Sequence, residues 1–196
     1  MTDIKKHLII VAHPSTKGFS HAVAKVYKEA AEKKGGEVEL INLYDEEWHL
    51  DFLTFENIKE DFPKPLVAEK IREKILWAER VIFCFPLWWF DCPAILKNMF
   101  DLVFIPGFAY RYDRVFPKSI AKGKLGPRQA SLFVTCDSSK WVYRLLLNPM
   151  KTNWIVGRIW FCGFKLRNFT LFDRMLFRTE KEKESFLRVA EQVAKH

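Results

Sequence analysis

Three short and largely apolar runs of residues stand out along the chain, at positions 8–12, 81–85 and 130–135. A strand that is buried on both faces has such an unbroken run, whereas a strand with one face in water alternates. The segments 37–41 and 166–172 mix polar with apolar residues. We therefore predict three buried strands, an edge strand at 37–41 and a half-exposed strand at 166–172.

Helical periodicity fills the intervals between these strands. Apolar residues recur three or four positions apart from Phe19 to Ala30, which is typical of a helix that packs by one face. Gly35 and Gly36 are expected to end this helix, and Pro65 and Pro93 stand where two further helices can begin. The remaining helices are predicted at about 67–75, 95–103, 153–161 and 186–193.

The strands and helices alternate along the whole chain, so the strands must be parallel and the crossovers right-handed. We predict an α/β fold: a single domain over residues 1–196, with a doubly wound five-stranded parallel sheet and helices on both faces. Residues 104–128 form an excursion from this plan. A sheet of this kind binds its ligand beyond the carboxyl ends of its strands, which places the candidate site in the loops 13–20, 86–92 and 136–143.

The composition, with 49% hydrophobic and 29% charged residues, is that of a globular protein. No apolar run approaches the roughly 18 residues of a membrane span, and the first apolar run is too short for a signal peptide. We therefore expect a cytoplasmic protein that is not integral to a membrane. The sequence has no CxxC pair, which favours free buried thiols over disulfides or a zinc site. Its cysteines are Cys84, Cys92, Cys136 and Cys162.

The charge is unevenly distributed along the chain. The overall net charge is +8, with −3 on residues 1–110 and +11 on residues 111–196. This excess suits phosphate-bearing ligands, nucleic acid or an anionic membrane surface, and a solvated basic face explains it equally well. No zinc finger, RNP-like stretch or heptad pattern accompanies the basic residues, so we do not expect nucleic acid as a partner.

The first candidate loop leads from a buried strand into a helix and reads HPSTKGFS from His13 to Ser20. The free amides at the start of the helix, with the hydroxyls and Lys17, would form a phosphate-binding arrangement. The loop is neither GxGxxG nor a P-loop, which disfavours a dinucleotide-binding Rossmann domain and a nucleoside triphosphatase. The alternative is an ordinary capped turn with Ser20 as the N-cap.

The second candidate loop contains three consecutive aromatic residues, Trp88, Trp89 and Phe90. A tight turn at this position would present backbone amides, and the rings would form a flat apolar wall that suits a planar ligand such as a flavin. A hydrophobic plug or a dimer contact would also account for these residues.

The segment from Phe85 to Tyr110 resembles the signature of the flavodoxin-like NAD(P)H:quinone oxidoreductases. Residues 85–101, FPLWWFDCPAILKNMFD, follow the family pattern of P-L-x-W-x, then P-A-x-L-K, then an acidic residue. Residues 107–110, GFAY, match its G-x-A-Y stretch, and the loop from His13 to Ser20 matches its phosphate-side loop. The resemblance extends over essentially the whole chain, whose length is closer to the short bacterial members than to the mammalian quinone reductases.

The resemblance implies a homodimeric flavoenzyme with bound FMN, or alternatively FAD. NAD(P)H would deliver a hydride to the flavin and leave, and a quinone or another flat electrophile would then take its place, which gives ping-pong kinetics. The flavin carries this chemistry, so no catalytic side chain is implied. Tyr110 would cover the partner's flavin and, with Trp88 and Phe90, contact the substrate. The implied flavin-binding residues are His13, Lys17, Gly18, Phe19, Ser20, Pro86, Leu87, Trp88, Trp89, Phe90, Thr135, Cys136 and Asp137.

The third candidate loop departs from the mammalian pattern, in which a glycine pair precedes a tyrosine and a histidine assigned to charge relay. Here residues 135–141 read TCDSSKW, and no such pair is assigned. Lys140 and Arg144 are candidates for contacting the 2′-phosphate of NADPH. Covering the helix that follows with their aliphatic stems would explain them equally well. A rival of another class is a regulatory ancillary subunit that docks on a membrane potassium-efflux transporter through its basic half. An electron-carrying flavodoxin is disfavoured because such carriers are usually acidic, and a member that has lost its flavin is a third alternative.

Overall fold

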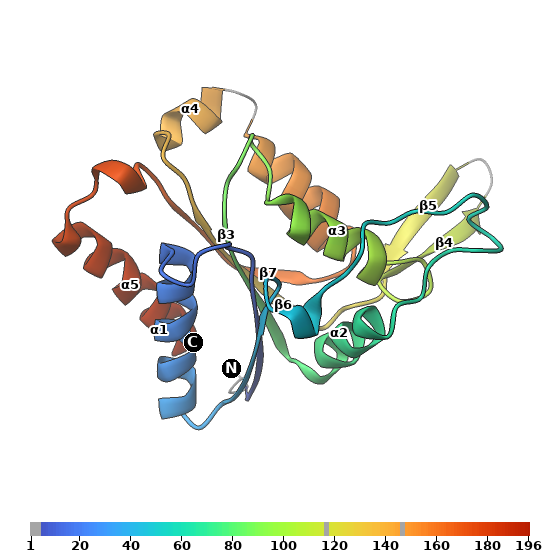
Figure 1. The fold of residues 1–196 in the computed structure, drawn as a ribbon, viewed down its shortest axis with the longest axis horizontal. Coiled ribbons are helices and arrows are strands. Elements are labelled where there is room, and N and C mark those ends of the chain that lie inside the picture. Colours follow the sequence, from blue (N-terminus) through green and yellow to red (C-terminus); the bar gives the residue numbers. More distant parts are fainter. Residues whose placement is uncertain (1–4, 116–117, 146–147) are drawn as a thin grey trace.

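A five-stranded, all-parallel sheet in the order β2-β1-β3-β6-β7 forms the centre of the protein (Figure 1). The computed structural model describes residues 5–115, 118–145 and 148–196, with the backbone alone for 114, 115, 118–120 and 144. The predicted α/β fold with a doubly wound sheet is confirmed. Its strands are β1 (Lys6–Val11), β2 (Glu37–Asn42), β3 (Arg80–Pro86), β6 (Gln129–Thr135) and β7 (Lys165–Phe172).

Helices cover both faces of this sheet (Figure 1). On one face α1 (Phe19–Lys33) and α5 (Glu180–Ala194) pack against each other and against the strands. The opposite face is covered by α2 (Leu66–Trp77), α3 (Ala94–Val103) and the π-helix η2 (Met150–Trp160). The predicted helices are therefore confirmed, with boundaries that differ by a few residues.

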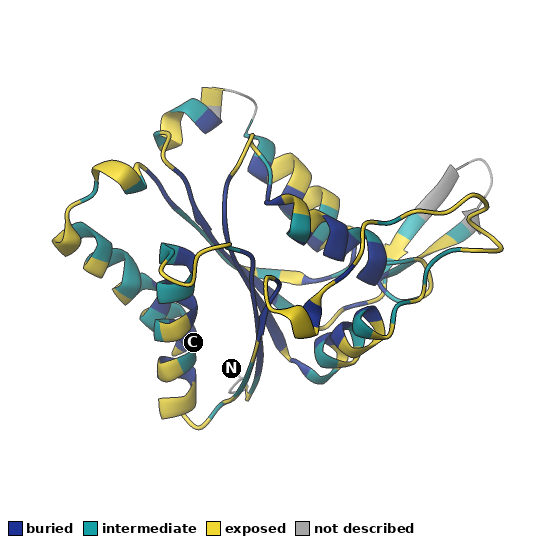
Figure 2. Ribbon diagram, in the orientation of Figure 1, coloured by how far each residue is buried: buried dark blue, intermediate teal, exposed yellow. Residues whose placement is uncertain are grey.

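Successive residues of β1 belong to two different apolar cores, which explains the unbroken apolar runs in the sequence. Ile9 and Val11 face α1 and α5, whereas Leu8 and Ile10 face α2 and α3. All four side chains are fully buried. The central strands are accordingly buried along their length, while exposed residues gather on the outer helix faces and loops (Figure 2).

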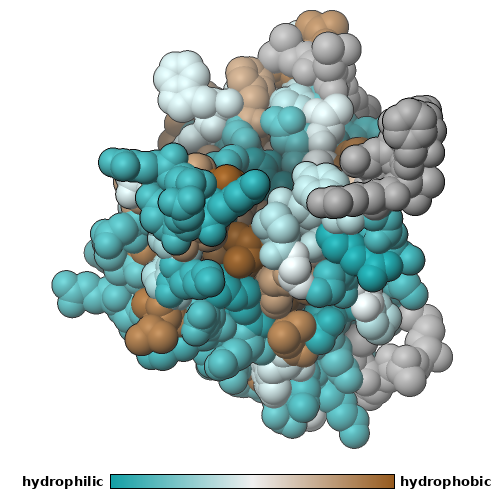
Figure 3. Space-filling view, turned by 90° about the vertical axis from the view of Figure 1, so that its right-hand side faces the viewer, coloured by the Kyte–Doolittle hydropathy of each residue, from teal (hydrophilic) through white to brown (hydrophobic). Residues whose placement is uncertain are grey.

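The excursion between α3 and β6 contains an antiparallel hairpin, β4 (Tyr110–Val115) with β5 (Lys118–Gly123), that the sequence analysis did not predict. The hairpin projects from the body of the protein (Figure 1). The surface on that side is largely hydrophilic, with apolar atoms in small separate patches (Figure 3). A strand pair that lies outside the main cores needs no apolar run, so the sequence carries little signal for it.

Among the residues that the structure describes, three short helices also lie outside the predicted set. They are η1 (Glu46–Trp48), α4 (Lys140–Leu145) and η3 (Met175–Phe177). Each is too short to show a helical period, which is why only the loops were predicted there. In the described part of the chain, no helix has both the length and the apolar character needed to cross a membrane.

The predicted state of the cysteines is confirmed, because all four are free and buried. Burial raises the pKa of the Cys84 thiol well above its usual value, and it raises that of Cys92 and of Cys162 to about 12. Among the described residues, no group of three or more His, Cys, Asp or Glu could hold a metal ion.

Candidate functional site

The three candidate loops lie at the same, carboxyl end of the sheet, because each follows one of the neighbouring parallel strands β1, β3 and β6. The amide of Leu87 donates to the carbonyl of Thr135 (2.7 Å), which joins the second loop to the third. The amide of Cys136 donates to the carbonyl of Phe172 (2.9 Å), which joins the third loop to the last strand. The strand order thus places the predicted positions at one end of the sheet, and hydrogen bonds join the second and third loops.

The first loop is closed by its own hydrogen bonds. The Gly18 amide donates to the Ser15 carbonyl (2.8 Å), and the Lys17 amide donates to Ser15 Oγ (3.3 Å). His13 Nδ1 lies within hydrogen-bond distance of the Ser15 amide (3.1 Å) and carbonyl (2.9 Å). The ring of His21 bonds to the His13 carbonyl (3.1 Å), which ties the loop to the first turn of α1.

Two features of this loop fit an anion. A Cβ at residue 18 would come within 2.3 Å of the His13 ring, so the loop requires glycine there. Ser20 is 1% exposed, and its hydroxyl has no hydrogen-bond partner within the part of the chain that the structure describes. Leaving such a group unpaired costs about 1–3 kcal/mol. The first amides of α1, beginning at Phe19, also lack partners within the helix, so a phosphate here would satisfy several donors together.

The alternative interpretation of Ser20 as an N-cap is wrong. Helix α1 begins at Phe19, the N-cap position is Gly18, and no side chain makes a capping hydrogen bond there. Ser20 therefore lies inside the first turn of the helix. Its buried hydroxyl makes no hydrogen bond to the helix end.

The second loop is a tight turn over Trp88, Trp89, Phe90 and Asp91, here called the aromatic turn. The amide of Trp88 donates to the Asp91 carbonyl (2.8 Å) and the amide of Asp91 donates to the Trp88 carbonyl (3.0 Å). Trp89 and Phe90 have φ angles of 51° and 63°. Turns with two central residues in this left-handed region usually contain asparagine or glycine. Holding a bulky residue there costs about 1–3 kcal/mol each, which is a common feature of functional sites.

The aromatic side chains of this turn are exposed. Trp89 is 97% exposed, and Trp88 and Phe90 are 43% and 41% exposed. Pro86 and Leu87, by contrast, are buried at the end of β3 and support the turn from below. Exposed aromatic side chains of this kind are a candidate contact surface for a ligand or a partner.

In the third loop, Thr135 and Cys136 are buried and Asp137 is exposed. The Cys136 thiol donates to the Ser138 carbonyl (3.3 Å), and burial is the main reason that its pKa is raised to about 11. Asp137 Oδ1 accepts from the amide of Leu176 in η3 (3.1 Å). Cys136 is thus a neutral thiol, and the Asp137 carboxylate is directed toward η3.

Tyr143 was not among the predicted site residues, and the structure places it against the aromatic turn. The ring of Tyr143, in α4, meets the ring of Phe90 edge-on at 5.6 Å. Burial, followed by the neighbouring Cys136, raises the pKa of Tyr143 to about 12. A tyrosine at the end of the predicted loop 136–143 was the available signal, but without the structure its distance from the aromatic turn could not be judged.

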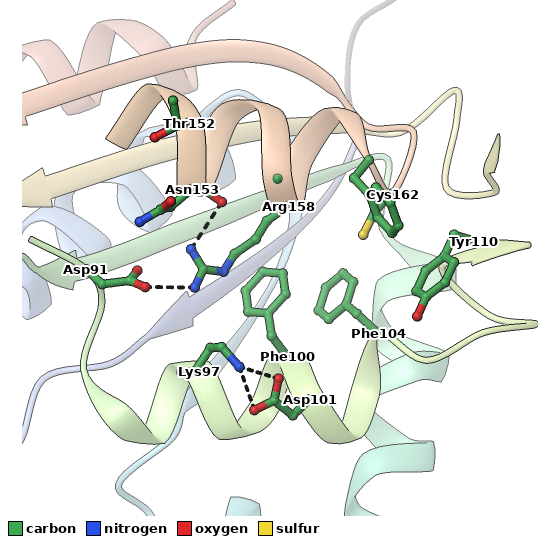
Figure 4. A pocket seen from close by; sticks show the side chains of 12 residues that line it. Asp91, Lys97, Phe100, Asp101, Phe104, Tyr110, Thr152, Asn153, Arg158 and Cys162 are labelled. Carbon is green, nitrogen blue, oxygen red and sulfur yellow. Dashed lines mark hydrogen bonds and ion pairs between the residues drawn. The ribbon is translucent and has the colours of Figure 1, made fainter. Parts of the chain in front are cut away.

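Tyr110 lies away from the three loops of its own chain. Its ring packs on Phe161 (4.8 Å) and Tyr112 (5.5 Å), and it lines a cavity of about 490 Å³ between α3 and η2. Asp91 lies at the other end of this cavity (Figure 4). The predicted contact of Tyr110 with the flavin of a partner subunit therefore stays a prediction.

The segment 104–116 is rich in apolar and aromatic residues for a connection between secondary-structure elements. Phe104 and Ala109 are buried in the chain's own core, which accounts for part of that apolarity, and Tyr112 is exposed. Phe116 lies outside the described residues.

Of the two candidates for contacting NADPH, Lys140 already interacts with Asp173 of its own chain. Its amide donates to the buried Asp173 (3.1 Å), and its ammonium lies 4.0 Å from the same carboxylate. Burial alone would raise the pKa of Asp173, but the hydrogen bonds from Lys140 and Arg178 lower it overall. The side chain of Arg144 lies outside the described residues, so the NADPH contact stays a prediction.

Residues 5–196 match the family described as having the flavodoxin-like fold. NAD(P)H dehydrogenase (quinone) 1 of Cavia porcellus is 30% identical over 195 residues, which cover 85% of this chain and 67% of that protein. The match to the Rattus norvegicus protein covers 66% of its length, so the chain spans about two thirds of these mammalian relatives.

Solved structures agree on the fold. The NAD(P)H:quinone oxidoreductase from Methanothermobacter marburgensis has a TM-score of 0.84 and 24% identity, with 98% of each chain covered. An FMN-dependent NADH-azoreductase from Bacillus anthracis, solved in complex with FMN, has a TM-score of 0.73 and 18% identity, over 97% of this chain and 98% of that one. The family resemblance found in the sequence is confirmed. The chain belongs to the flavodoxin-like fold family that includes the NAD(P)H dehydrogenases (quinone).

Proposed function

We infer that the protein is a flavin-dependent NAD(P)H:quinone oxidoreductase. It would take a hydride from NAD(P)H and pass it to a quinone or a similar flat electrophile. The observation that carries this proposal is the meeting of two unlike surfaces at one end of the sheet. The first loop, residues 13–20, here called the anion loop, and the exposed aromatic turn follow the neighbouring parallel strands β1 and β3 at the same end of the sheet. Within the described residues, the buried Ser20 hydroxyl of the anion loop has no hydrogen-bond partner. A flavin mononucleotide has a phosphate for the first and a planar ring for the second.

The proposed flavin contacts divide between the loops. Gly18, Phe19 and Ser20, with Lys17 and His13, would hold the phosphate, because the amides, the hydroxyl and the ammonium are all donors to an anion. The aromatic turn would line the ring through its side chains and backbone, supported by Pro86 and Leu87. Thr135, Cys136 and Asp137 would close the opposite edge. FMN is the proposed form, supported by the azoreductase that shares this fold and was solved with FMN.

A bound flavin would supply the hydride acceptor and donor. The side chains near it are therefore expected to bind and to hold protons. With its raised pKa, Tyr143 stays protonated at neutral pH and can donate a hydrogen bond. Cys136, a neutral thiol, is not a nucleophile under the same conditions. One face of the ring would serve NAD(P)H and the acceptor in turn, which is the basis for proposing ping-pong kinetics.

The experiment that tests this function begins with the visible absorption spectrum of the purified protein, followed by release and chromatography of any flavin. The FMN-loaded protein is then assayed for NADPH and NADH oxidation with a naphthoquinone acceptor, with both concentrations varied. Parallel double-reciprocal lines are expected. Absence of a flavin spectrum, together with no saturable binding of added FMN or FAD, would refute the proposal.

A further inference from the structure

The aromatic turn is fastened to helix η2 through the carboxylate of Asp91. Asp91 Oδ1 accepts hydrogen bonds from the Cys92 amide (2.7 Å) and from the indole Nε1 of Trp154 (3.0 Å). Asp91 Oδ2 forms an ion pair with Arg158 Nη2 (3.0 Å). The two charged groups reach toward each other from opposite walls of the cavity between α3 and η2 (Figure 4).

The helix side of this contact is embedded in the core. Trp154 is fully buried and stacks on Phe85, just before the end of β3, with ring centroids 4.4 Å apart and an interplanar angle of 26°. The guanidinium of Arg158 lies 4.8 Å from the Trp154 ring and 5.7 Å from the Phe100 ring. The groups that hold Asp91 are thus themselves fixed against the central sheet.

The turn side of the contact is strained. Trp89 and Phe90 keep left-handed backbone angles although neither is glycine or asparagine. A strained conformation persists only where its surroundings over-determine it. The two backbone hydrogen bonds across the turn are internal to it, whereas the Asp91 carboxylate and the contact of Phe90 with Tyr143 tie it to the rest of the molecule.

We propose that Asp91 and Arg158 are positioning residues that hold the aromatic turn in the geometry that presents Trp89 and Phe90 to the flavin. The proposal rests on the function proposed above, because it takes the flavin as the ligand of the turn. Neither residue is assigned a contact with the flavin. They act through the backbone of the turn and through Trp154.

The first measurement is the Kd for FMN, read from the quenching of flavin fluorescence, in Asp91→Ala, Asp91→Asn and Arg158→Met. Each protein is used only where its circular dichroism shows the wild-type fold. Asp91→Ala and Arg158→Met are expected to raise the Kd tenfold or more. The Kd of Asp91→Asn should lie between theirs and that of the wild type, because the asparagine side chain can still accept hydrogen bonds from Trp154 and Cys92. The double variant Asp91→Ala/Arg158→Met should bind FMN no more weakly than the weaker-binding single variant, because each change removes the same ion pair between Asp91 and Arg158.

The second measurement does not depend on flavin. Chymotrypsin cuts after aromatic residues, so the turn is a substrate once it opens, and mass spectrometry identifies cleavage after residues 88–90. The flavin-free variants Asp91→Ala and Arg158→Met should be cut there several times faster than the wild type. Lys97→Met is the matched control for both measurements. Lys97 lines the same cavity but pairs with Asp101 on α3, not with the turn.

The outcomes separate this proposal from the proposed function. If the wild type binds neither FMN nor FAD, the function is wrong, and the chymotrypsin comparison still decides whether Asp91 and Arg158 hold the turn. If folded Asp91→Ala and Arg158→Met bind FMN with the wild-type Kd, the positioning role is wrong, whatever their stability. If Lys97→Met changes the Kd for FMN and the cleavage rate as much as Asp91→Ala and Arg158→Met do, the positioning role is also wrong. The effects would then come from disturbing the cavity as a whole.

Discussion

The imidazole ring of His13 occupies the space that a side chain at Gly18 would need. A Cβ built on Gly18 would lie 2.3 Å from two atoms of that ring. The φ angle of Gly18 is −66°, which any residue can adopt, so the requirement for glycine is one of space alone. The anion loop therefore takes its shape from a contact between its first residue and the residue that caps α1.

Replacing Gly18 should show this contact directly. Gly18→Ala is expected to lower the free energy of unfolding by about 1–3 kcal/mol, the usual cost of overpacking, and to weaken FMN binding because His13 must move. In a His13→Ala background the same change should cost little, since the ring is gone. Urea denaturation of the four proteins measures the coupling. An equal cost in both backgrounds would contradict the steric explanation.

Ser20→Ala should have opposite effects on stability and on binding. Removing a buried hydroxyl that lacks a partner should leave the flavin-free protein as stable as the wild type or slightly more stable. FMN binding should weaken by about 1.5–3 kcal/mol, roughly tenfold or more, through loss of a hydrogen bond to a charged phosphate. Thermal unfolding and FMN titration measure the two effects.

The matched control for this prediction is Ser131→Ala. Ser131 is also fully buried, and its hydroxyl has no partner among the described residues, but it lies within β6 rather than at the anion loop. Its replacement should leave the Kd for FMN unchanged. If the two variants weaken FMN equally, the Ser20 hydroxyl is not a phosphate ligand.

The double change Trp88→Ala/Phe90→Ala should abolish retention of FMN on a desalting column without unfolding the chain. Both side chains are partly exposed, so little core packing is lost, whereas the flat wall for the ring is removed. Trp160→Ala removes an exposed tryptophan of η2 and serves as the control. Stoichiometric flavin in the double variant would mean that the ring binds elsewhere.

Stability in acid should depend on Glu182, which closes the capping box of α5. The amide of Thr179 (2.9 Å) and then Arg178 (2.7 Å) donate to its carboxylate and lower the pKa of Glu182 from 4.5 to about 2. Because the folded pKa lies below the unfolded one, this contribution is present above pH 4.5 and is lost as the pH falls toward 2. Glu182→Gln should lower the urea midpoint at neutral pH and flatten its decline across this window.

Glu184→Gln makes the same charge change two residues further along α5 and is the control for Glu182. Equal flattening in both variants would indicate that total charge, not the capping box, sets the acid sensitivity.

Assembly is tested by sedimentation. We propose a homodimer in which the surface around Tyr110 and the exposed Tyr112 contributes to the interface. Analytical ultracentrifugation at micromolar concentration should give a dimer, and Tyr112→Glu should shift it toward the monomer. A monomeric wild type would refute the proposal.

The central sheet was predictable because its strands are buried on both faces. Leu8 and Ile10 fill one core while Ile9 and Val11 fill the other, so the sequence shows an unbroken apolar run that no surface strand would have. Once the strands and crossovers were placed, the three loops at the carboxyl end followed from topology alone.

The hairpin and the short helices were not predictable by the same reasoning. In β4, Arg111 and Asp113 alternate with Tyr110 and Tyr112, and no continuous core imposes a pattern on them. Helices η1, α4 and η3 are too short to show a helical period.

The supporting contacts of the site needed the structure itself. Asp91 and Arg158 are 67 positions apart, and nothing in either segment indicates the partner. Tyr143 reaches Phe90 only because a short helix follows β6. Sequence patterns record which residues face a core, but they do not record which polar side chains meet across a cavity.

The burial of every thiol has a chemical consequence for a protein that meets quinones. Quinones are Michael acceptors, and they arylate cysteine through the thiolate, the reactive form of the side chain. Cys92, Cys136 and Cys162 are buried with pKa values raised to about 12, 11 and 12, and the pKa of Cys84 is raised further. At neutral pH the chain therefore offers its proposed substrates almost no nucleophilic sulfur, and repeated turnover need not end in covalent self-inactivation.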